Sequence, residues 1–211
     1  MTSQLGSFIS GNAMATAPQQ YELLELMVKA VEDVKRRLRK STDALEAAGI
    51  PYAVIGGNAV AAWVETVEPS AVRTTVDVDL LLRREDFERA KLTLEAAGFI
   101  YDNILGVDLF LDDRNANPRQ AVHILWAAEK VKLNDPETAP DVESVEILKN
   151  RRVLSLESLL KMKLIAYRTK DRMHMLDMIE LGMIDQSWPA RFQPELASRL
   201  QYLLDNPEPS H

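Results

Sequence analysis

The 211-residue sequence contains no cysteine and only three histidines. Without cysteine, the chain has no disulfide bonds, no thiolate metal sites and no cysteine nucleophile. So few histidines also argue against a structural zinc site, which without cysteine needs several imidazole ligands. A chain without cysteine is compatible with a bacterial-type cytoplasm, and we expect a cytoplasmic location.

Long apolar runs are missing as well. No run approaches the roughly 20 apolar residues that cross a bilayer, and residues 1–17 lack the basic start and continuous apolar core of a signal peptide. We therefore expect no membrane partner. The formal net charge of -7 means that the surface as a whole does not attract nucleic acid, so any such contact needs a local basic patch.

The order of the apolar patterns predicts an α+β fold with a small mixed sheet. Residues 1–19 are small and polar and are predicted to form a flexible tail. We predict an α/β core at 20–130, a linker with edge strands at 131–150 and a mainly helical C-terminal region at 151–211. Helices are predicted at 21–48, 58–66, 84–97, 155–169, 173–181 and 194–204, and strands at 52–55, 76–82, 99–101, 107–111, 121–127, 145–148 and 152–154.

An apolar stripe runs along the predicted helix 21–48, at Leu24, Met27, Val31, Val34 and Leu38. The stripe is shorter than the three to four heptads typical of a coiled coil, so we predict that it packs on the sheet. The basic residues between positions 35 and 40 lie on the other faces of this helix. We interpret them as a solvated surface, with contact to an RNA backbone as the alternative.

Two acids stand close together in the predicted strand 76–82. Asp77 and Asp79 are two residues apart, so in a strand they share one face, roughly 6.6 Å apart along it. In extended geometry Arg73 and Thr75 would lie on the same face. Two neighbouring carboxylates in a buried strand need a cation, and Mg2+ binds carboxylates together with substrate phosphates. The pattern therefore predicts a Mg2+ site.

A glycine pair precedes this strand by about twenty residues. Gly56 and Gly57 follow the short apolar run 52–55 and are followed by an alanine-rich segment with helical character. This is the pattern of a strand-to-helix turn, in which the backbone can approach a phosphate near the start of a helix.

Together these blocks resemble the signature of the nucleotidyltransferase superfamily that includes DNA polymerase beta, and in particular its AbiEii/AbiGii toxin-like branch. The matching residues are Gly56-Gly57 and, after a helix-length spacer, Arg73-x-Thr75-x-Asp77-Val78-Asp79-Leu80. The resemblance implies a nucleotidyltransferase-type mixed sheet flanked by helices. It also implies Mg2+-dependent transfer of a nucleoside monophosphate from a nucleoside triphosphate onto a tRNA, protein or small-molecule acceptor, with a cognate antitoxin if the chain is toxin-like.

The resemblance also gives each matched position a role. The two aspartates would hold the catalytic Mg2+ against the triphosphate, and the two glycines would receive its phosphates. Arg73 and Thr75 would complete the nucleotide-binding side.

Members of the family commonly carry a third carboxylate on a later strand, and here the matching segment 120–126 has His123 at that position. His123 is then the catalytic general base, since an imidazole with a pKa near 6.5 accepts protons at neutral pH. Alternatively the base is lost and the protein binds nucleotide or a partner without turnover, or His123 is a partly buried residue satisfied by the backbone. Asp108, on the preceding strand, is a weaker candidate for the third carboxylate.

A second block lies on and after the predicted helix 155–169. Lys163 falls in the middle of the apolar face of this helix, where a charge needs a partner or a path to the surface. The segment resembles the family's downstream motif, and the matching residues are Lys163-Leu-Ile-Ala166-Tyr-Arg168, Asp171-Arg172 and Asp177. His174 stands where relatives often have an acid.

The downstream resemblance implies a phosphate-binding wall. Lys163, counted with the catalytic residues, would touch the nucleotide phosphates together with Arg168 and Arg172, and Asp177 would orient the phosphates or a water. Basic residues also outnumber acids between positions 149 and 172. That local excess would attract a triphosphate or an RNA end despite the acidic whole.

Overall fold

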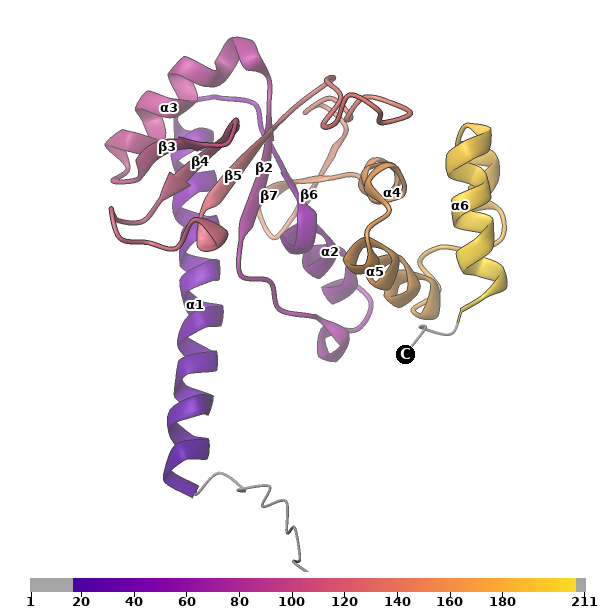
Figure 1. Ribbon diagram of the computed structural model, residues 1–211, viewed down its shortest axis with the longest axis horizontal. Helices are drawn as coiled ribbons and strands as arrows, with labels where there is room; N and C mark the ends of the chain where they lie inside the picture. Colours follow the sequence, from indigo (N-terminus) through magenta and orange to yellow (C-terminus); the bar gives the residue numbers. More distant parts are fainter. Residues whose placement is uncertain (1–16, 208–211) are drawn as a thin grey trace, which may run out of the picture.

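The computed structural model describes residues 17–207. Residues 1–16 of the predicted tail lie outside this range, and residues 17–19 belong to the first helix. Within the range the chain forms a seven-stranded mixed sheet flanked by six α-helices (Figure 1), which confirms the predicted α+β fold. In sheet order the strands are β3 (Ile100–Ile104), β4 (Val107–Leu111), β5 (Val122–Trp126), β2 (Val78–Leu82), β1 (Ala53–Ile55), β7 (Arg151–Leu154) and β6 (Val145–Leu148).

The helices follow the predicted pattern with shifted ends. They are α1 (Ala17–Ala47), α2 (Gly56–Glu65), α3 (Phe87–Ala96), α4 (Leu156–Ala166), α5 (Thr169–Glu180) and α6 (Pro194–Asp205), with short 3-10 helices η1 (Pro69–Ala71), η2 (Arg84–Asp86), η3 (Pro118–Gln120) and η4 (Trp188–Arg191). The glycine pair itself forms the first turn of α2, which therefore starts two residues before its predicted start. Gly49 and Gly98 follow α1 and α3 with φ of +61° and +87°, as a left-handed C-terminal cap requires.

β2 is the central strand, antiparallel to β1 and parallel to β5. Its last three residues, the leucines at 80–82, are completely buried, as expected of a strand covered on both faces. The register pairs Asp79 with Ile55 of β1 and with His123 of β5. The centre of the sheet therefore joins the end of β1, the acid of β2 and the histidine of β5.

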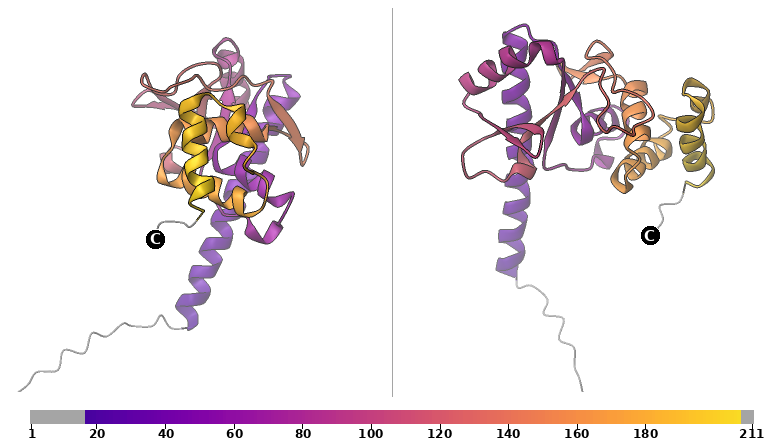
Figure 2. Two further views of the ribbon diagram at one scale, coloured as in Figure 1. Left: turned by 90° about the vertical axis from the view of Figure 1, so that its right-hand side faces the viewer. Right: turned by 45° about the horizontal axis from the view of Figure 1, so that its top comes forward.

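Only part of α1 packs on the body of the protein. Val34 of the predicted stripe is buried, as is Leu45 beyond it, whereas Leu24 and Met27 of the stripe are 56% and 60% exposed. A helix of 31 residues is roughly 46 Å long, and its N-terminal half extends past the other elements (Figures 1 and 2). The prediction that the stripe packs on the sheet is therefore correct only for its C-terminal part.

The basic run of α1 is not entirely solvated, contrary to its interpretation from sequence. Arg37 is 5% exposed. Its Nε donates to Oδ2 of Asp112 at 2.9 Å, and its Nη1 donates to the backbone oxygen of Val76 at 3.4 Å. The guanidinium thus fixes the backbone directly before Asp77.

The strands predicted at 145–148 and 152–154 both form, as β6 and β7, and of these two only β6 lies at the edge of the sheet. β7 pairs in parallel with β1, through Val54 and Val153, and antiparallel with β6. The hairpin of β6 and β7 completes the same sheet, so the predicted domain boundary at residue 150 falls inside it. The sheet extends beyond the predicted core of 20–130.

The C-terminal region is helical after β7, as predicted. Ser155 caps α4, with its Oγ accepting from the backbone N–H of Ser158 at 3.3 Å. α4 ends at Tyr167, whose φ of +45° turns the chain into α5. α6 stabilises the end of α4, because Nη1 of Arg199 donates to the backbone oxygens of Leu164 at 2.6 Å and Ile165 at 3.1 Å. Within residues 17–207, none of the helices has the length and apolar character needed to cross a membrane.

Candidate active site

The start of α2 lies directly against the carboxylate of Asp79. Gly56 has a φ of +66°, and a β-carbon built on it would be 2.0 Å from Oδ2 of Asp79. A β-carbon on Gly57 would lie 2.9 Å from the side chain of Thr75. Both positions therefore require glycine, because a side chain at either would collide with Asp79 or Thr75. This contact places the positive end of the α2 dipole next to an acid.

Asp77 lies in a bend before β2, and not in the strand as predicted, because β2 begins only at Val78. Two side chains hold the bend. Nδ2 of Asn58 in α2 donates to the backbone oxygen of Asp77 at 2.7 Å, and Oγ1 of Thr75 donates to its Oδ1 at 2.5 Å. Thr75, predicted to bind nucleotide, thus positions an acid.

Asp77 and Asp79 nevertheless converge, and His123 joins them. One ligand atom from each of the three lies within 4.8 Å of the others. Nδ1 of His123 is 3.5 Å from Oδ1 of Asp79. The cluster draws on the bend before β2, on β2 itself and on β5. The sheet register fixes Asp79 beside His123, and the contacts with Asn58 and Thr75 hold Asp77.

The two ring nitrogens of His123 have different surroundings. Nε2 lies 2.9 Å from the backbone oxygen of Pro118, to which it donates a hydrogen bond. The hydrogen bond with Asp79 raises the pKa of His123, against the opposing effect of burial. When no cation is bound, a proton on Nδ1 of His123 therefore favours the pairing of the imidazole with the Asp79 carboxylate.

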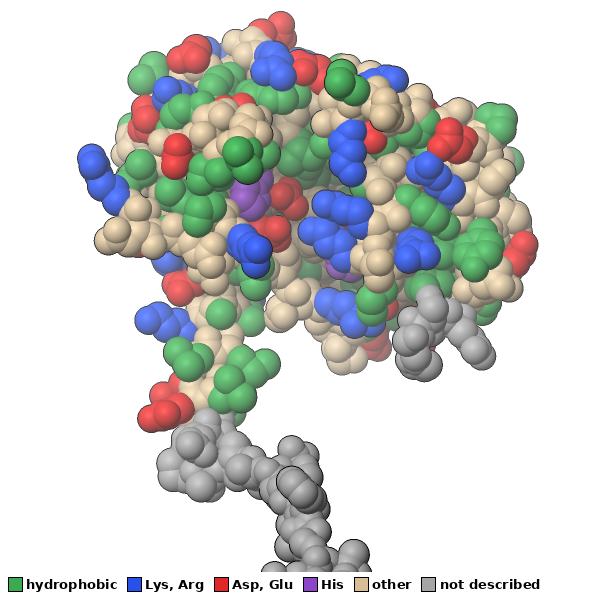
Figure 3. Space-filling view, viewed as in Figure 1, with side chains coloured by type: hydrophobic (Ala, Val, Ile, Leu, Met, Phe, Trp, Pro, Cys, Tyr) green, Lys and Arg blue, Asp and Glu red, His purple; other side chains and the backbone are tan. Residues whose placement is uncertain are grey.

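A cavity of about 560 Å³ opens over this cluster, a volume in the usual range for small-molecule sites. Its lining includes Gly56, the three cluster residues, part of the segment 124–139 and the facing parts of α4 and α5. In Figure 3, histidine and acidic side chains face lysine and arginine side chains across the hollow. The cationic residues that α4, α5 and the turn between them add to the lining are Lys163, Arg168 and Lys170, here called the cationic wall.

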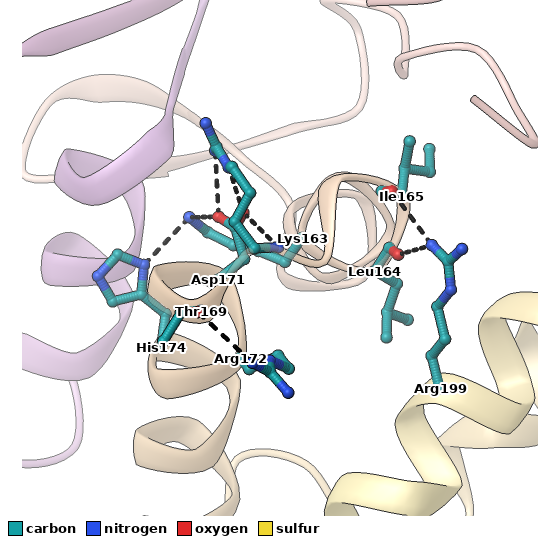
Figure 4. Close-up of polar contacts among 9 residues, drawn as sticks. Lys163, Leu164, Ile165, Thr169, Asp171, Arg172, His174 and Arg199 are labelled. Carbon is teal, nitrogen blue, oxygen red and sulfur yellow. Dashed lines mark hydrogen bonds and ion pairs between the residues drawn. The ribbon is translucent and has the colours of Figure 1, made fainter. Parts of the chain in front are cut away.

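Lys163 is held in this wall by a buried ion pair (Figure 4). Its Nζ donates to Oδ1 of Asp171 at 3.0 Å and to Nδ1 of His174 at 3.1 Å. Arg168 donates to the other carboxylate oxygen of Asp171, from Nε at 2.7 Å. The side chains of Lys163 and Asp171 are 5% and 1% exposed, so Lys163 has a partner and does not reach the surface.

The pKa values of Lys163, Asp171 and His174 depend on one another. Burial lowers the pKa of Lys163, although Asp171 opposes the change. Burial by itself would raise the pKa of Asp171, but the hydrogen bonds from Arg168 and Lys163 outweigh it and lower that pKa. Burial and the Lys163 ammonium lower the pKa of His174 to about 4. His174 is therefore neutral at pH 7, as an acceptor of the Lys163 proton must be.

Five of the residues predicted to bind nucleotide do not line the cavity: Gly57, Arg73, Thr75, Arg172 and Asp177. Arg73 forms a bidentate ion pair with Asp177, with distances of 2.6 and 2.9 Å, at a separate small cavity that Gly57 also lines. Arg172 extends away from Lys163 and Asp171 (Figure 4); its Nη2 reaches Oγ1 of Thr169 at 3.5 Å. Their contribution to a nucleotide site is thus indirect at most in this arrangement.

Several of the basic residues between 149 and 172 pair with other groups of the protein. Lys149 pairs with Glu65 and Lys161 with Glu137, and Arg152 donates to the backbone oxygen of Tyr52 at 3.1 Å. Asp108, the weaker candidate for a third carboxylate, accepts from Tyr101 at 2.7 Å and from Asn103 at 2.8 Å and does not line the cavity.

Sequence reasoning gave Asp171 no role, yet it organises the cationic wall. The signal was available: Asp171 follows Lys163 by eight residues, and an acid and a lysine on neighbouring apolar faces are compatible with a buried pair. What the sequence could not show is the left-handed turn at Tyr167 that brings the two helices together.

The donor set fits a divalent cation. Two carboxylates and one imidazole converge within the range of a shared ion, and the carboxylates need a cation to offset their repulsion. Asp77 and Asp79 would hold the ion, with His123 within reach, beside the cavity that would receive a ligand.

No family model matches the sequence, and no curated protein matches it either. Similar solved structures do exist. A nucleotidyltransferase-like protein from Paracoccidioides brasiliensis is 18% identical with a TM-score of 0.54, covering 83% of this chain and 88% of its own. ANT(2")-Ia in complex with adenylyl-2"-tobramycin is 17% identical with a TM-score of 0.48, covering 78% of this chain and 94% of its own.

The similarity to the Paracoccidioides protein concerns the fold, and it does not distinguish the AbiEii/AbiGii branch from other branches. It agrees with the mixed sheet and the flanking helices. The chain therefore has a nucleotidyltransferase-type fold.

Proposed function

We propose that the protein is a divalent-cation-dependent nucleotidyltransferase that moves a nucleoside monophosphate from a nucleoside triphosphate onto an acceptor. The observation that carries the proposal is the convergence of Asp77 and Asp79 with the start of α2 at one cavity. Lys163 and Arg168 form the opposite wall. This arrangement supplies a cation site, backbone donors and fixed positive charge around one space, which is what phosphoryl transfer requires.

The triphosphate would lie between these two walls. The N-terminus of α2 offers backbone N–H groups and the positive end of the helix dipole. Because Gly56 has no side chain, the Asp79 carboxylate can lie directly against this helix start. The bound cation, Mg2+ in the family resemblance, supplies charge neutralisation of the phosphates. Lys163 and Arg168 add positive charge that the fold holds in place before the ligand arrives.

The proposed transfer balances as a substitution at phosphorus. An oxygen of the acceptor forms a new bond to the α-phosphorus, and the bond from that phosphorus to the bridging oxygen breaks. Pyrophosphate leaves with the electron pair, and the proton of the acceptor passes to solvent at the open side of the cavity. The residues of the chain bind, orient and neutralise charge, and none forms a covalent bond in this scheme.

The acceptor stays open among a tRNA, a protein hydroxyl and a small molecule. A toxin-like role with a cognate antitoxin rests on the sequence resemblance, and no contact among residues 17–207 bears on it. The alternative to the enzyme is a protein that binds nucleotide without turnover, and the same experiment distinguishes the two.

The test uses the full chain with each of the four nucleoside triphosphates labelled at the α-phosphate, with and without a divalent cation, in the presence of cell extract. We expect cation-dependent label on one acceptor, and a loss of about 100-fold or more when Asp77→Asn and Asp79→Asn are combined. Asp102→Asn, an exposed acid on the edge strand β3, is the matched control and should transfer normally. Nucleotide binding without transfer to any acceptor would support the binding protein, and absence of binding would overturn both.

A further inference from the structure

The cluster contains a ligand type that Mg2+ does not favour. Mg2+ prefers oxygen ligands in a near-ideal octahedral arrangement, whereas imidazole nitrogen suits transition metals. Two carboxylates together with one imidazole are a mixed donor set. The presence of His123 can therefore change which cation the site prefers.

The second ring nitrogen of His123 is held as it is in a metal-ligating histidine. A ligating histidine generally donates its other N–H to a carboxylate or a backbone carbonyl, which fixes the tautomer and the ring orientation. Here Nε2 donates to the backbone oxygen of Pro118 at 2.9 Å. In the neutral ring this leaves the lone pair on Nδ1, the atom 3.5 Å from Oδ1 of Asp79.

The surroundings fix the ring from both sides. The parallel register of β2 and β5 places His123 directly beside Asp79, so backbone hydrogen bonds set the separation of the two side chains. The carbonyl of Pro118 belongs to η3, whose first turn is capped by Asn117 through a hydrogen bond to the backbone N–H of Arg119 at 3.0 Å. The imidazole thus needs little rearrangement to serve as a ligand.

We propose that Asp77, Asp79 and His123 form a mixed carboxylate–imidazole site that binds Mn2+ in preference to Mg2+. The inference rests on the proposed function for the location of the cation and goes beyond it in the choice of ion. Mn2+ shares with Mg2+ its affinity for carboxylate oxygens. As a transition metal it also takes an imidazole nitrogen as a ligand. His123 is then a ligand and not the general base, because a coordinated nitrogen has no lone pair for a proton.

The test measures the ion directly, apart from any transfer reaction. Pulsed electron paramagnetic resonance of Mn2+ added to the full chain should show hyperfine coupling to one imidazole nitrogen. The coupling should disappear in His123→Asp and His123→Gln and persist in His174→Gln, which removes the neighbouring imidazole that bonds to Lys163. Absence of nitrogen coupling in the wild-type protein overturns the proposal without requiring any variant to fold.

Calorimetry with Mn2+ alone and Mg2+ alone completes the test. We expect His123→Gln to lower Mn2+ affinity by about tenfold or more, the scale on which even supporting partners of a ligand affect metal binding. His123→Asp should bring the two affinities closer by restoring an all-oxygen site, and an unchanged ratio contradicts the proposal. If transfer proceeds with Mg2+ while Mn2+ shows no nitrogen coupling, the ion assignment fails and the proposed function stands.

Discussion

Gly56 and Asp79 are packed so closely that a β-carbon on the glycine would lie 2.0 Å from Oδ2 of the aspartate. Gly56→Ala should therefore displace the Asp79 carboxylate in addition to straining a backbone with a φ of +66°. Gly49→Ala is the matched control, because Gly49 has a φ of +61° with no atom within 4 Å of its added β-carbon.

The backbone strain of a non-glycine residue in this region is about 1–2 kcal/mol, and both variants should show it in urea denaturation. Gly56→Ala should be less stable than Gly49→Ala by a further amount of about 1 kcal/mol or more, because of the contact with Asp79. It should also weaken cation binding, which Gly49→Ala leaves unchanged. Equal stabilities and equal cation affinities would show that the contact relaxes without consequence.

The buried group around Lys163 should respond unequally to the loss of its two charges. Asp171→Asn leaves the Lys163 ammonium and the Arg168 guanidinium without a counter-ion, and should reduce the free energy of unfolding by about 3–5 kcal/mol. Lys163→Met should have a smaller effect, since Asp171 keeps Arg168 at 2.7 Å. Urea denaturation measures both, with the exposed Lys170→Met as a control. The reverse order of stability would contradict the assignment of Asp171 as the shared partner.

Lys163→Met also separates binding from folding. If Lys163 contributes positive charge to the cavity, the folded variant should bind a nucleoside triphosphate more weakly than the wild-type protein, as measured by calorimetry. An unchanged affinity would limit Lys163 to a structural role.

The pair of Arg73 and Asp177 ties the loop before β2 to α5. The side chain of Arg73 is 56% exposed, so the coupling of the two residues in a double-mutant cycle should be only about 0.2–1 kcal/mol. Arg73→Ala and Asp177→Ala should then weaken nucleotide binding equally, because either change releases the same loop. A much larger loss for Arg73→Ala alone would indicate that the guanidinium reaches the nucleotide directly.

Stability below neutral pH should depend on His174. Its pKa is lowered to about 4 in the folded protein, because it is buried beside Lys163, against about 6.5 in the unfolded chain. The stabilisation is thus complete above pH 6.5 and is lost as the pH falls towards 4, where the unfolded state takes up a proton first. The slope is at most about 1.4 kcal/mol per pH unit.

The comparison of wild type with His174→Gln isolates this effect. His123 acts in the opposite direction, since its raised pKa stabilises the protein below pH 6.5 and the stabilisation is lost as the pH rises through the folded pKa. The lowered pKa of Asp171 acts only below its unfolded value of about 3.9. Between pH 6.5 and 4 the wild type should lose stability relative to the variant, and parallel curves would rule this out.

The central part of the fold was predictable from sequence because local patterns encode it. The leucines at 80–82 are apolar on both faces, which marks a central strand, and the glycine pair marks the start of a helix. The acids therefore fell in the right place, although the strand begins only after Asp77. The bend at that position depends on Asn58 and Thr75, two contacts with no periodic signal.

The polar partners could not be predicted, because they join distant segments. Lys163 was recognised as needing a partner, but its pairing with Asp171 depends on the left-handed residue Tyr167. The burial of Arg37 depends on Asp112, 75 residues away. For His123, the sequence suggested a base, while the hydrogen bond with Pro118 that determines which nitrogen is free appears only in three dimensions.

The parallel pair of β1 and β7 sets the order in which the two walls of the cavity can form as the chain folds. Arg152 donates to the backbone oxygen of Tyr52, 100 residues earlier, and closing so long a loop is slow and entropically unfavourable. The acids on and before β2 lie near α2 in the chain, whereas Lys163 and Asp171 follow β7. During synthesis the residues of the anionic wall therefore emerge before those of the cationic wall, and the pairing of β1 with β7 can form only after both strands have emerged.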